Sequence, residues 1–257
     1  MSDLDFHLFI CRSDNYGLLL HDHKTGETAS LDAPDAAAIE HHLETRGWRL
    51  THILTTHHHA DHVEGNLPLQ QRFGCQVIGP KAEAQRIPGI DREVSGGDSF
   101  TWAGHEVRVM DCPGHTSGHI AFHMPAQQAV FAGDTLFSLG CGRVFEGSLR
   151  EMFTSVSQFR ALPPETRLYC GHEYTQSNAR FALSVEPGNA ALQQRAAEVD
   201  RLRSENRMTC PTTIAMELAT NPFLRTDSAE IRRNLGLQQA SEAEVFAELR
   251  RRKDSFK

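Results

Sequence analysis

The sequence lacks the features that mark membrane, secreted and thiol-dependent proteins. It contains no run of 18 apolar residues, so no transmembrane helix is predicted. Its start, Met-Ser-Asp-Leu-Asp-Phe-His, has no basic segment followed by a long apolar one, so a secretory signal is not expected. The six cysteines are scattered singly, without the paired CxxC spacing of a zinc ribbon or redox motif. We therefore expect reduced thiols in the cytoplasm.

Positive charge and repeated sequence are also scarce. The 257 residues carry a formal net charge of −7 and show no basic stripe with interleaved aromatic residues, which argues against a nucleic-acid partner. No internal repeat or low-complexity tract is evident. With 39% hydrophobic and 23% charged residues, the composition is typical of a globular protein. We expect a monomer that acts on a small molecule and has no membrane partner.

The pattern of expected elements changes near Tyr174. Before it, short strands are predicted over 16–21, 52–55, 75–78, 106–110, 119–123 and 129–132. Helices are predicted over 34–46 and 67–73, and Ser148 with Glu151 forms a capping-box pattern that opens another. After it, strand signals nearly vanish, and helices are predicted over 190–207, over 228–235 and from Ser241 onward. The sequence thus predicts an α/β domain over 1–174 and a smaller helical domain over 175–257.

The densest cluster of chemically active side chains follows the strand expected at 52–55. In Thr56-His57-His58-His59-Ala60-Asp61-His62, four imidazoles and one carboxylate fall within six consecutive residues. Alternate residues of an extended segment point the same way, so His57 and His59 can reach one point together. Asp61 and His62 lie past the bend and can serve a second point. Imidazole and carboxylate suit transition metals, which makes a metal site more plausible than a fortuitous surface cluster.

Three further segments place a polar side chain at the end of an expected strand. They are Pro-Gly-His115-Thr, Gly-Asp134-Thr and Cys-Gly-His172-Glu. Each alone is a weak signal, because a Gly-Asp or Gly-His at a strand end is often only a turn. Loops at one edge of a rigid sheet are where functional side chains collect, so together with the histidine run these segments predict one site.

The number of these side chains matches two metal ions. The first ion would take three nitrogens, from His57, His59 and His115. The second ion would take two nitrogens and one oxygen, from His62, His172 and Asp61. Asp134 would bridge both and leave room for a hydroxide. A metal lowers the pKa of its bound water from 15.7 toward ~7, and two metals ~3.5–4 Å apart can hold both the nucleophile and the developing oxyanion. The chemistry implied is hydrolysis at a carbonyl or phosphoryl centre, with Asp61 and Asp134 as catalytic residues beside a metal-bridging hydroxide.

The remaining histidines show no such spacing. His58 has the wrong parity to share the target of His57, and His119 serves either to orient a ligand or as a packed structural residue. The others are interpreted as surface or packing residues: His7, His21, His23, His41, His42, His52, His105 and His123. Cys141 has no base beside it and is interpreted as structural, not as a nucleophile.

The motifs resemble those of the metallo-β-lactamase superfamily. The resemblance rests on Thr-His57-His-His59-Ala-Asp61-His62, Pro-Gly-His115-Thr, Gly-Asp134-Thr and Gly-His172. It implies an α+β fold, the αββα sandwich, with a dinuclear metal site at one edge. The metals implied are two divalent ions per chain, zinc first, with iron or manganese as alternatives. The fold leaves the substrate open, because hydrolases, nucleases, lactonases and oxygenases share it.

Segments of the second half resemble the glyoxalase II family, the hydroxyacylglutathione hydrolases. They are Gly-Cys-Gly-Arg143-Val-Phe-Glu-Gly, Cys-Gly-His-Glu-Tyr174-Thr, Glu217-Leu-Ala-Thr-Asn-Pro-Phe-Leu-Arg and Arg250-Arg-Arg-Lys253. The resemblance implies hydrolysis of S-D-lactoylglutathione and related 2-hydroxyacyl thioesters to D-lactate and glutathione, the second step of methylglyoxal detoxification. It also implies glutathione contacts by Arg143, Tyr174, Arg250 and Lys253. Phe145 stands where many members have Tyr, which removes one hydroxyl from the expected contacts.

The chemistry of the residues agrees with this substrate. The thiol leaving group has a pKa of about 8.5, so it can depart without a strong general acid. Glutathione carries two carboxylates, which arginine can bind bidentately. The alternative interpretation of residues 250–253 is a set of cations that complement a helix dipole. Three rival functions stay open: a persulfide dioxygenase of the same fold with one iron, a nuclease of the superfamily, and a metal-storage module.

Overall fold

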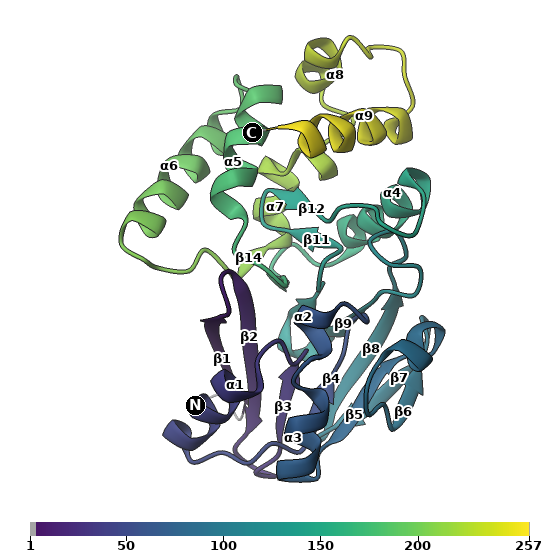
Figure 1. Cartoon of the computed structure of the whole chain (residues 1–257). Helices are drawn as coiled ribbons and strands as arrows, with labels where there is room; N and C mark the ends of the chain where they lie inside the picture. The colour runs from purple at the N-terminus through teal and green to yellow at the C-terminus, as the bar shows by residue number, and fades with distance from the viewer. Residues whose placement is uncertain (1–3, 257) are drawn as a thin grey trace. The chain divides into compact units, whose positions relative to one another are not determined.

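The computed structural model describes residues 4–256 of the chain (Figure 1). Within this range the chain divides into two units. Unit 1 contains residues 4–111 and 117–127, and unit 2 contains residues 112–116 and 128–256. None of the helices in the described range is both long and apolar enough to cross a membrane.

Unit 1 is built mainly from strands. Six of them pair in chain order: β1 Leu4–Cys11, β2 Asn15–Asp22, β3 Thr28–Leu31, β4 His52–Leu54, β5 Gln76–Pro80 and β6 Arg92–Val94. The pairs β1–β2 and β2–β3 are antiparallel, whereas β3–β4, β4–β5 and β5–β6 are parallel. A second group pairs antiparallel: β7 Ser99–Trp102, β8 His105–Asp111 and β9 Ile120–Met124. Because β3, β4 and β5 are parallel, their carboxyl ends meet at one edge.

Short helices connect the parallel strands of unit 1. They are α1 Ala36–Arg46, α2 Ala60–Val63, α3 Asn66–Phe73 and the 3₁₀ segment η1 Lys81–Arg86. A second 3₁₀ segment, η2 Pro125–Gln127, follows β9. The side chain of Asp35 caps α1 by accepting from the Ala38 amide, and Gly74 ends α3 in the left-handed conformation. These are the start and stop signals that favour helix boundaries.

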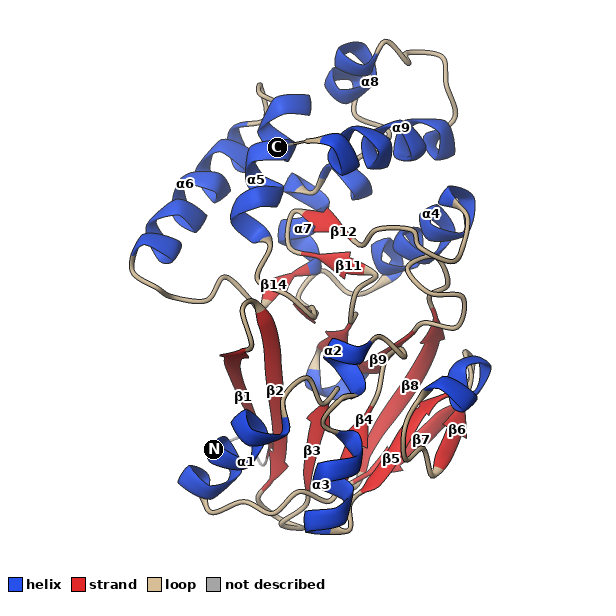
Figure 2. Ribbon diagram, in the orientation of Figure 1, coloured by secondary structure: helices blue, strands red, loops and turns tan. Residues whose placement is uncertain are grey.

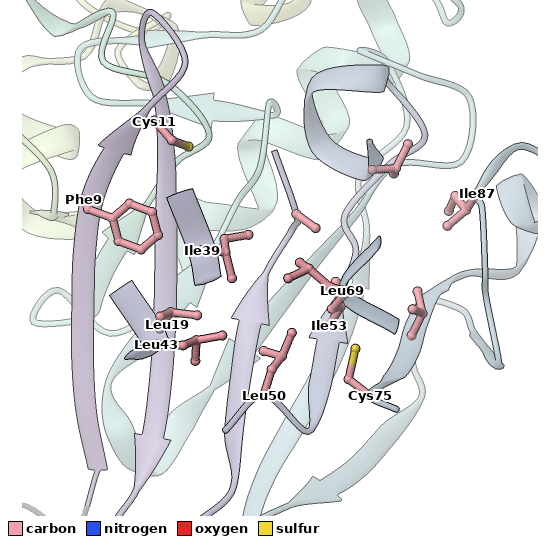
Figure 3. Close-up of a cluster of buried hydrophobic side chains, with 13 residues drawn as sticks. Phe9, Cys11, Leu19, Ile39, Leu43, Leu50, Ile53, Leu69, Cys75 and Ile87 are labelled. Atoms are coloured by element: carbon pink, nitrogen blue, oxygen red, sulfur yellow. The ribbon is translucent and has the colours of Figure 1, made fainter. Parts of the chain in front are cut away.

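A buried apolar cluster joins the sheet of unit 1 to its helices (Figure 3). Phe9, Leu19 and Ile53 project from the strands, and Ile39 and Leu43 project from α1. The two α1 residues are four apart, which places them on one helix face. Burial of each large aliphatic side chain contributes about 1.5–3 kcal/mol, so this cluster fixes the strands that carry the histidine run.

Unit 2 contains few strands. They are β10 Ala129–Phe131, β11 Leu136–Phe137, β12 Gly140–Cys141, β13 Arg167–Tyr169 and β14 Thr212–Thr213. Strands β10 and β13 are parallel, β13 and β14 are antiparallel, and β11 with β12 forms a hairpin. The buried Glu217 and Asn221 hold this hairpin: Glu217 Oε2 accepts from the Leu139 amide at 2.8 Å, and Asn221 Nδ2 donates to the Phe137 and Gly140 carbonyls. Burial raises the pKa of Glu217.

Helices make up most of unit 2 (Figure 2). They are α4 Leu149–Gln158, η3 Phe159–Ala161, α5 Thr175–Val185, α6 Ala190–Ser204, α7 Ile214–Thr220, η4 Pro222–Leu224, α8 Ala229–Leu235 and α9 Glu242–Ser255. The predicted capping box of Ser148 with Glu151 is present at α4, and Ser241 with Glu244 forms a second one at α9. Gly236 ends α8 in the left-handed conformation, so the helix stops at Leu235 as the predicted range 228–235 has it.

Candidate metal centre

The histidine run lies at the carboxyl end of β4. The chain leaves the strand at Leu54, continues without regular structure through His59, and enters α2 at Ala60. His57 Nε2 lies 3.1 Å from His59 Nδ1, so the two alternate side chains converge as their parity predicts. A cation ~2.1 Å from each nitrogen fits this separation.

Asp32 supports the run from the neighbouring strand end. It follows β3, which is parallel to β4, and is 6% exposed. Its Oδ1 accepts a hydrogen bond from the Thr56 amide at 2.7 Å, and its Oδ2 lies 2.8 Å from His62 Nδ1. The Thr56 hydroxyl is 2.9 Å from Asp32 Oδ2 and 3.1 Å from His57 Nδ1. One carboxylate thus orients His62 directly and His57 through a hydroxyl.

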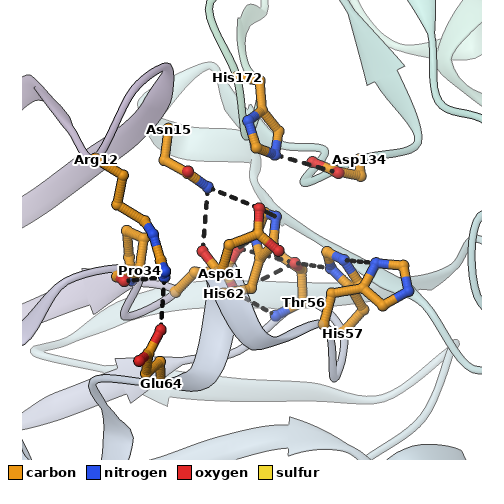
Figure 4. A network of polar contacts seen from close by, with 12 residues as sticks. Arg12, Asn15, Pro34, Thr56, His57, Asp61, His62, Glu64, Asp134 and His172 are labelled. Carbon is orange, nitrogen blue, oxygen red and sulfur yellow. Dashed lines mark hydrogen bonds and ion pairs between the residues drawn. The ribbon is translucent and has the colours of Figure 1, made fainter.

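Asn15 supports Asp61 (Figure 4). Asn15 is buried at the start of β2. Its side-chain Nδ2 donates to Asp61 Oδ2 and to the Asp61 carbonyl, each at 3.1 Å. Asp61 Oδ2 also lies 3.7 Å from His62 Nε2. The carboxylate and the imidazole therefore face each other across the first turn of α2.

His58 points to a different partner, as its parity predicts. The buried Glu83 of η1 accepts from the His58 amide at 2.8 Å, and the same oxygen lies 2.7 Å from His58 Nδ1. The second oxygen of Glu83 accepts from the Gly118 amide at 2.8 Å. A Cβ at position 118 would come within 2.7 Å of Glu83 Cγ, so glycine permits this approach. Glu83 therefore joins the histidine run to the segment that leads into β9.

His119 is a packed residue in this segment. It is fully buried, and its ring stacks on His57 with centroids 4.8 Å apart and planes at 28°. The Ile120 amide donates to the Thr56 carbonyl at 3.0 Å. Two roles were considered for His119, orienting a ligand and packing. The observed stacking serves both, because a packed His119 ring limits the rotation of the His57 ring.

Asp134, His172 and His115 come together within unit 2. Asp134 follows β10 and His172 follows β13, and the parallel pairing of these strands brings their ends together. Asp134 Oδ2 lies 3.4 Å from His172 Nε2 and 3.3 Å from His115 Nε2. One carboxylate oxygen thus faces two imidazole nitrogens, so Asp134 is placed where two of the predicted ligands converge.

The loop after β12 orients His115. Its Nδ1 hydrogen-bonds the Arg143 carbonyl at 2.9 Å, which turns Nε2 toward Asp134. Gly142 permits this close approach, because a Cβ there would lie 1.9 Å from the Asp134 carbonyl oxygen. A side chain at position 142 would therefore displace the loop that carries the Arg143 carbonyl.

Arg250 holds the same loop from α9. This residue is 3% exposed, and its Nη1 donates to the Cys141 carbonyl at 2.7 Å. Burial raises the pKa of the Cys141 thiol to about 11, despite the neighbouring guanidinium of Arg250. Cys141 therefore stays a thiol at neutral pH, in agreement with its predicted structural role.

The ring orientations fit metal ligands. In three of the predicted ligands, His57, His62 and His115, Nδ1 faces a protein oxygen and Nε2 faces another predicted ligand. Such partners fix the tautomer and the orientation of metal-binding imidazoles. Nitrogen and carboxylate oxygen together suit divalent transition metals. The donor set in each unit therefore fits the group that the sequence implies.

The residues expected to contact glutathione all lie in unit 2. The Tyr174 ring stacks on His172 with centroids 4.7 Å apart and planes at 2°. Arg143 Nε lies 3.6 Å from Asp254 Oδ1, which also accepts from Arg250 Nε at 3.1 Å. Lys253 Nζ donates to Ser177 Oγ at 3.0 Å. Arg143 and Tyr174 are exposed, Lys253 is half-buried, and the buried Arg250 is committed to the Cys141 carbonyl and to Asp254.

Three supporting residues were not predicted: Asn15, Asp32 and Glu83. Asp32 carries only a weak signal, because it is an acid that directly follows a strand, but two of the four residues of that strand, Thr28 and Ser30, are polar. Glu83 gives no local signal, since it lies in a short 3₁₀ segment and its partners are 25 and 35 residues away. Asn15 likewise meets Asp61 only through a contact 46 residues apart in sequence.

Comparison with known families agrees with this chemistry. The family described as the metallo-beta-lactamase superfamily matches residues 26–172, so the chain belongs to that superfamily. The family described as hydroxyacylglutathione hydrolase C-terminus matches residues 173–256. Hydroxyacylglutathione hydrolases from Brucella ovis and Brucella abortus strain 2308 are each 59% identical over 253 residues, which is 98% of this chain and 98% of theirs. Within the superfamily, the chain belongs to the hydroxyacylglutathione hydrolase family.

Solved structures share the fold at low sequence identity. The BLEG-1 B3 metallo-beta-lactamase is similar with a TM-score of 0.65 and 20% identity, covering 86% of this chain and 99% of its own. ETHE1 from Myxococcus xanthus gives a TM-score of 0.66 and 22% identity, covering 98% of this chain and 100% of its own. The predicted α+β class, a metallo-β-lactamase fold with a helical C-terminal region, is confirmed.

Proposed function

We propose that the chain is a thioester hydrolase that cleaves S-D-lactoylglutathione, and related 2-hydroxyacyl glutathione thioesters, to the hydroxy acid and glutathione. The observation that carries this conclusion is the 59% identity to hydroxyacylglutathione hydrolases over 98% of both chains. The resemblance covers the ligand motifs of the first part and the basic end of α9 alike. The activity is the second step of methylglyoxal detoxification.

The two sets of ligands are proposed to hold two divalent ions. One ion is assigned to His57, His59 and His115, the other to Asp61, His62 and His172, with Asp134 shared. When bound, such a pair of ions activates a water molecule and polarises the thioester carbonyl. Support comes from the superfamily match and from the orientation of the rings in each unit. The imidazole and carboxylate donors suit zinc first, with iron or manganese as alternatives.

The protein's own contribution is orientation. Asp32 and Thr56 hold His62 and His57, and the Arg143 carbonyl holds His115. Because Asp32 and Thr56 are buried and all three partners are already in place, the ligands need little rearrangement when the reaction begins. Asp134 and Asp61 are the two carboxylates assigned to the catalytic centre.

The glutathione part is assigned to Arg143, Tyr174, Arg250 and Lys253. The exposed Arg143 and the half-buried Lys253 can pair with the glutathione carboxylates, and Tyr174 offers a hydroxyl and a partly exposed ring. The buried Arg250 would act by holding the loop that carries Arg143. The free thiol has a pKa of about 8.5, so the thiolate leaves without a protein acid. The substrate residues therefore serve to place the carbonyl, and no proton donor is needed among them.

Three broader assignments accompany this function. The catalytic domain is proposed to span 1–174 and the glutathione-binding helical domain 175–257, which is supported by family matches to 26–172 and 173–256. The singly spaced, buried cysteines support a reducing cytoplasm. A monomer with a small-molecule substrate stays a prediction.

The test is an assay of S-D-lactoylglutathione hydrolysis, in which the loss of thioester absorbance is monitored. Elemental analysis of the same preparation gives its metal content. We expect turnover together with two metal ions per chain. Asp134→Ala should lose both activity and metal. Full metal content without hydrolysis would contradict the proposal, and oxygen uptake with glutathione persulfide would indicate a persulfide dioxygenase instead.

A further inference from the structure

A second group of imidazoles lies in unit 1, away from the ligand run in sequence. The group consists of His7 on β1, His21 on β2 and His42 on α1. These imidazoles lie beside Phe9 of the buried cluster or beside Trp48, which packs against it. The register pairs His21 with Asp5, and alternation places Asp5 and His7 on the same face of β1. The sequence assigns no role to these residues beyond surface or packing positions.

Two of these imidazoles converge. His7 Nε2 lies 3.0 Å from His42 Nδ1, although the residues are 35 apart in sequence. This is close to the 3.1 Å that separates the nearest nitrogens of His57 and His59. Both nitrogens can lie ~2.0–2.1 Å from one cation, which is the distance of a zinc–imidazole bond.

Aromatic packing holds the pair in place. The His42 ring stacks on Phe9 with centroids 3.8 Å apart. The His7 ring meets Phe9 at 5.5 Å and the edge of Trp48 at 6.2 Å. The two rings come from a strand and a helix, not from loops, so their separation is set by the fold.

The pair borders a hollow that water and a metal ion can enter. Its volume is about 480 Å³, and its lining includes Asp5, His23, Arg46 and Trp48 beside the two imidazoles. Asp5 Oδ2 lies 3.1 Å from His23 Nε2, so the hollow also offers a carboxylate and a third imidazole. The positive charge of Arg46 would repel a bound cation. Its guanidinium is held over the Trp48 ring, 4.9 Å from the ring centroid.

We propose that His7 and His42 form a binding site for a late first-row divalent cation, with water completing its coordination. Imidazole nitrogen is a preferred ligand of copper, nickel and zinc. The ligands must be neutral to bind, and burial, helped by Arg46 and His42, lowers the pKa of His7 to about 4. The His7 ring is therefore neutral at physiological pH. The site does not depend on the proposed hydrolase activity.

Trp48 provides a local reporter of this site. Ni²⁺ and Cu²⁺ quench nearby tryptophan fluorescence, and Trp48 packs against His7 and stacks on His21 at 4.5 Å. The full chain, with its own metals retained, is titrated with NiCl₂ and then with CuCl₂. We expect saturable quenching at one added ion per chain in the wild type, and its loss in His7→Asn and in His42→Asn. Trp48→Phe gives the background from the second tryptophan, Trp102.

The matched control is His41→Asn, because His41 is exposed and adjacent to His42 on α1. It should quench like the wild type, and all variants should hydrolyse the thioester at the wild-type rate. Each variant's thermal unfolding is recorded, so that a misfolded variant is recognised and the other variant decides. The proposal would be overturned by an absence of quenching in the wild type. It would also be overturned if folded His7→Asn and His42→Asn were quenched as strongly as the wild type. Either result would leave a metal-free hydrogen bond between two neutral rings.

Discussion

The ligand run at 57–62 and the side chains assigned to glutathione differ in how they are supported. His57 and His62 are at most 2% exposed, and each has a ring nitrogen held by a buried partner. Tyr174 is 39% exposed, and the Arg143 guanidinium lies 3.6 Å from the exposed Asp254. The run is thus held by buried hydrogen bonds, whereas Arg143 and Tyr174 of the second group present exposed side chains to solvent.

This difference matches what each group is proposed to do. Metal ligands gain from a fixed geometry, since outer partners set the tautomer and the basicity of each imidazole. A flexible tripeptide substrate can be bound by side chains that adjust, at a cost of about 0.5–1.5 kcal/mol for each one that becomes ordered. Substitutions around the run should therefore alter metal affinity and stability, and those around the substrate should alter KM.

The largest effect is expected at Asp32. Asp32→Asn removes the charge that orients His62 and, through Thr56, His57. We expect metal affinity to fall by about 10–100-fold, the usual loss when an outer partner of a ligand is removed, measured by competition with a chelator. Asp35→Asn is the matched control, because Asp35 caps α1 and contacts no predicted ligand. Equal affinity in the Asp32 and Asp35 variants would show that the imidazoles orient without the carboxylate.

The ligand run could be predicted because its information is local. Parity within 57–62 indicates which side chains converge, and the strand-end positions of Asp134 and His172 indicate where the others lie. Their supporting residues could not be predicted in the same way. Glu83 and Asn15 act through contacts 25 to 46 residues away, which only the folded chain brings together.

The same distinction holds for the secondary structure. Helices α4, α8 and α9 were predicted because their ends carry capping residues that the sequence displays. Helix α5 was missed, and its N-cap Tyr174 makes no side-chain capping bond. The two-residue strands of the β11–β12 hairpin were also missed, since Glu217 and Asn221 stabilise it from far along the chain. Helix α7 was missed as well, although the Thr213 side chain caps it, so a capping residue alone does not predict a helix of only seven residues.

A second substitution tests the support at Glu83. The two carboxylate oxygens each accept from a backbone amide, at His58 and at Gly118. Glu83→Gln must turn its amide nitrogen toward one of these donors, so one buried N–H loses its acceptor. We expect the free energy of unfolding to fall by about 1–3 kcal/mol in urea titrations, with weaker metal binding. The exposed Glu93→Gln should change neither quantity. Unchanged stability at position 83 would indicate that water replaces the lost acceptor.

A smaller effect is expected from the charge of Lys253. Burial, together with the nearby Arg250, Arg180 and Arg143, lowers the pKa of Lys253 to about 8. As pH rises through 8, the side chain loses its charge and its attraction for a glutathione carboxylate. KM should therefore rise above pH 8, by up to about tenfold for one lost charge-assisted hydrogen bond. Lys253→Arg keeps its charge, so its KM should stay level across this range. A parallel rise in both proteins would assign the pH dependence to another group.

The smallest effect is expected at Phe145. Its ring is 59% exposed and lies 5.3 Å from the His115 ring, so a hydroxyl added by Phe145→Tyr meets solvent and leaves packing unchanged. If the hydroxyl binds the glutathione part, KM should fall by roughly twofold to tenfold, as one net hydrogen bond of about 0.5–1.5 kcal/mol allows. Hydrolysis of a small thioester without the glutathione part should stay unchanged. A change in metal affinity instead of KM would place Phe145 with the rigid ligand group, because its amide donates to the His115 carbonyl at 3.3 Å.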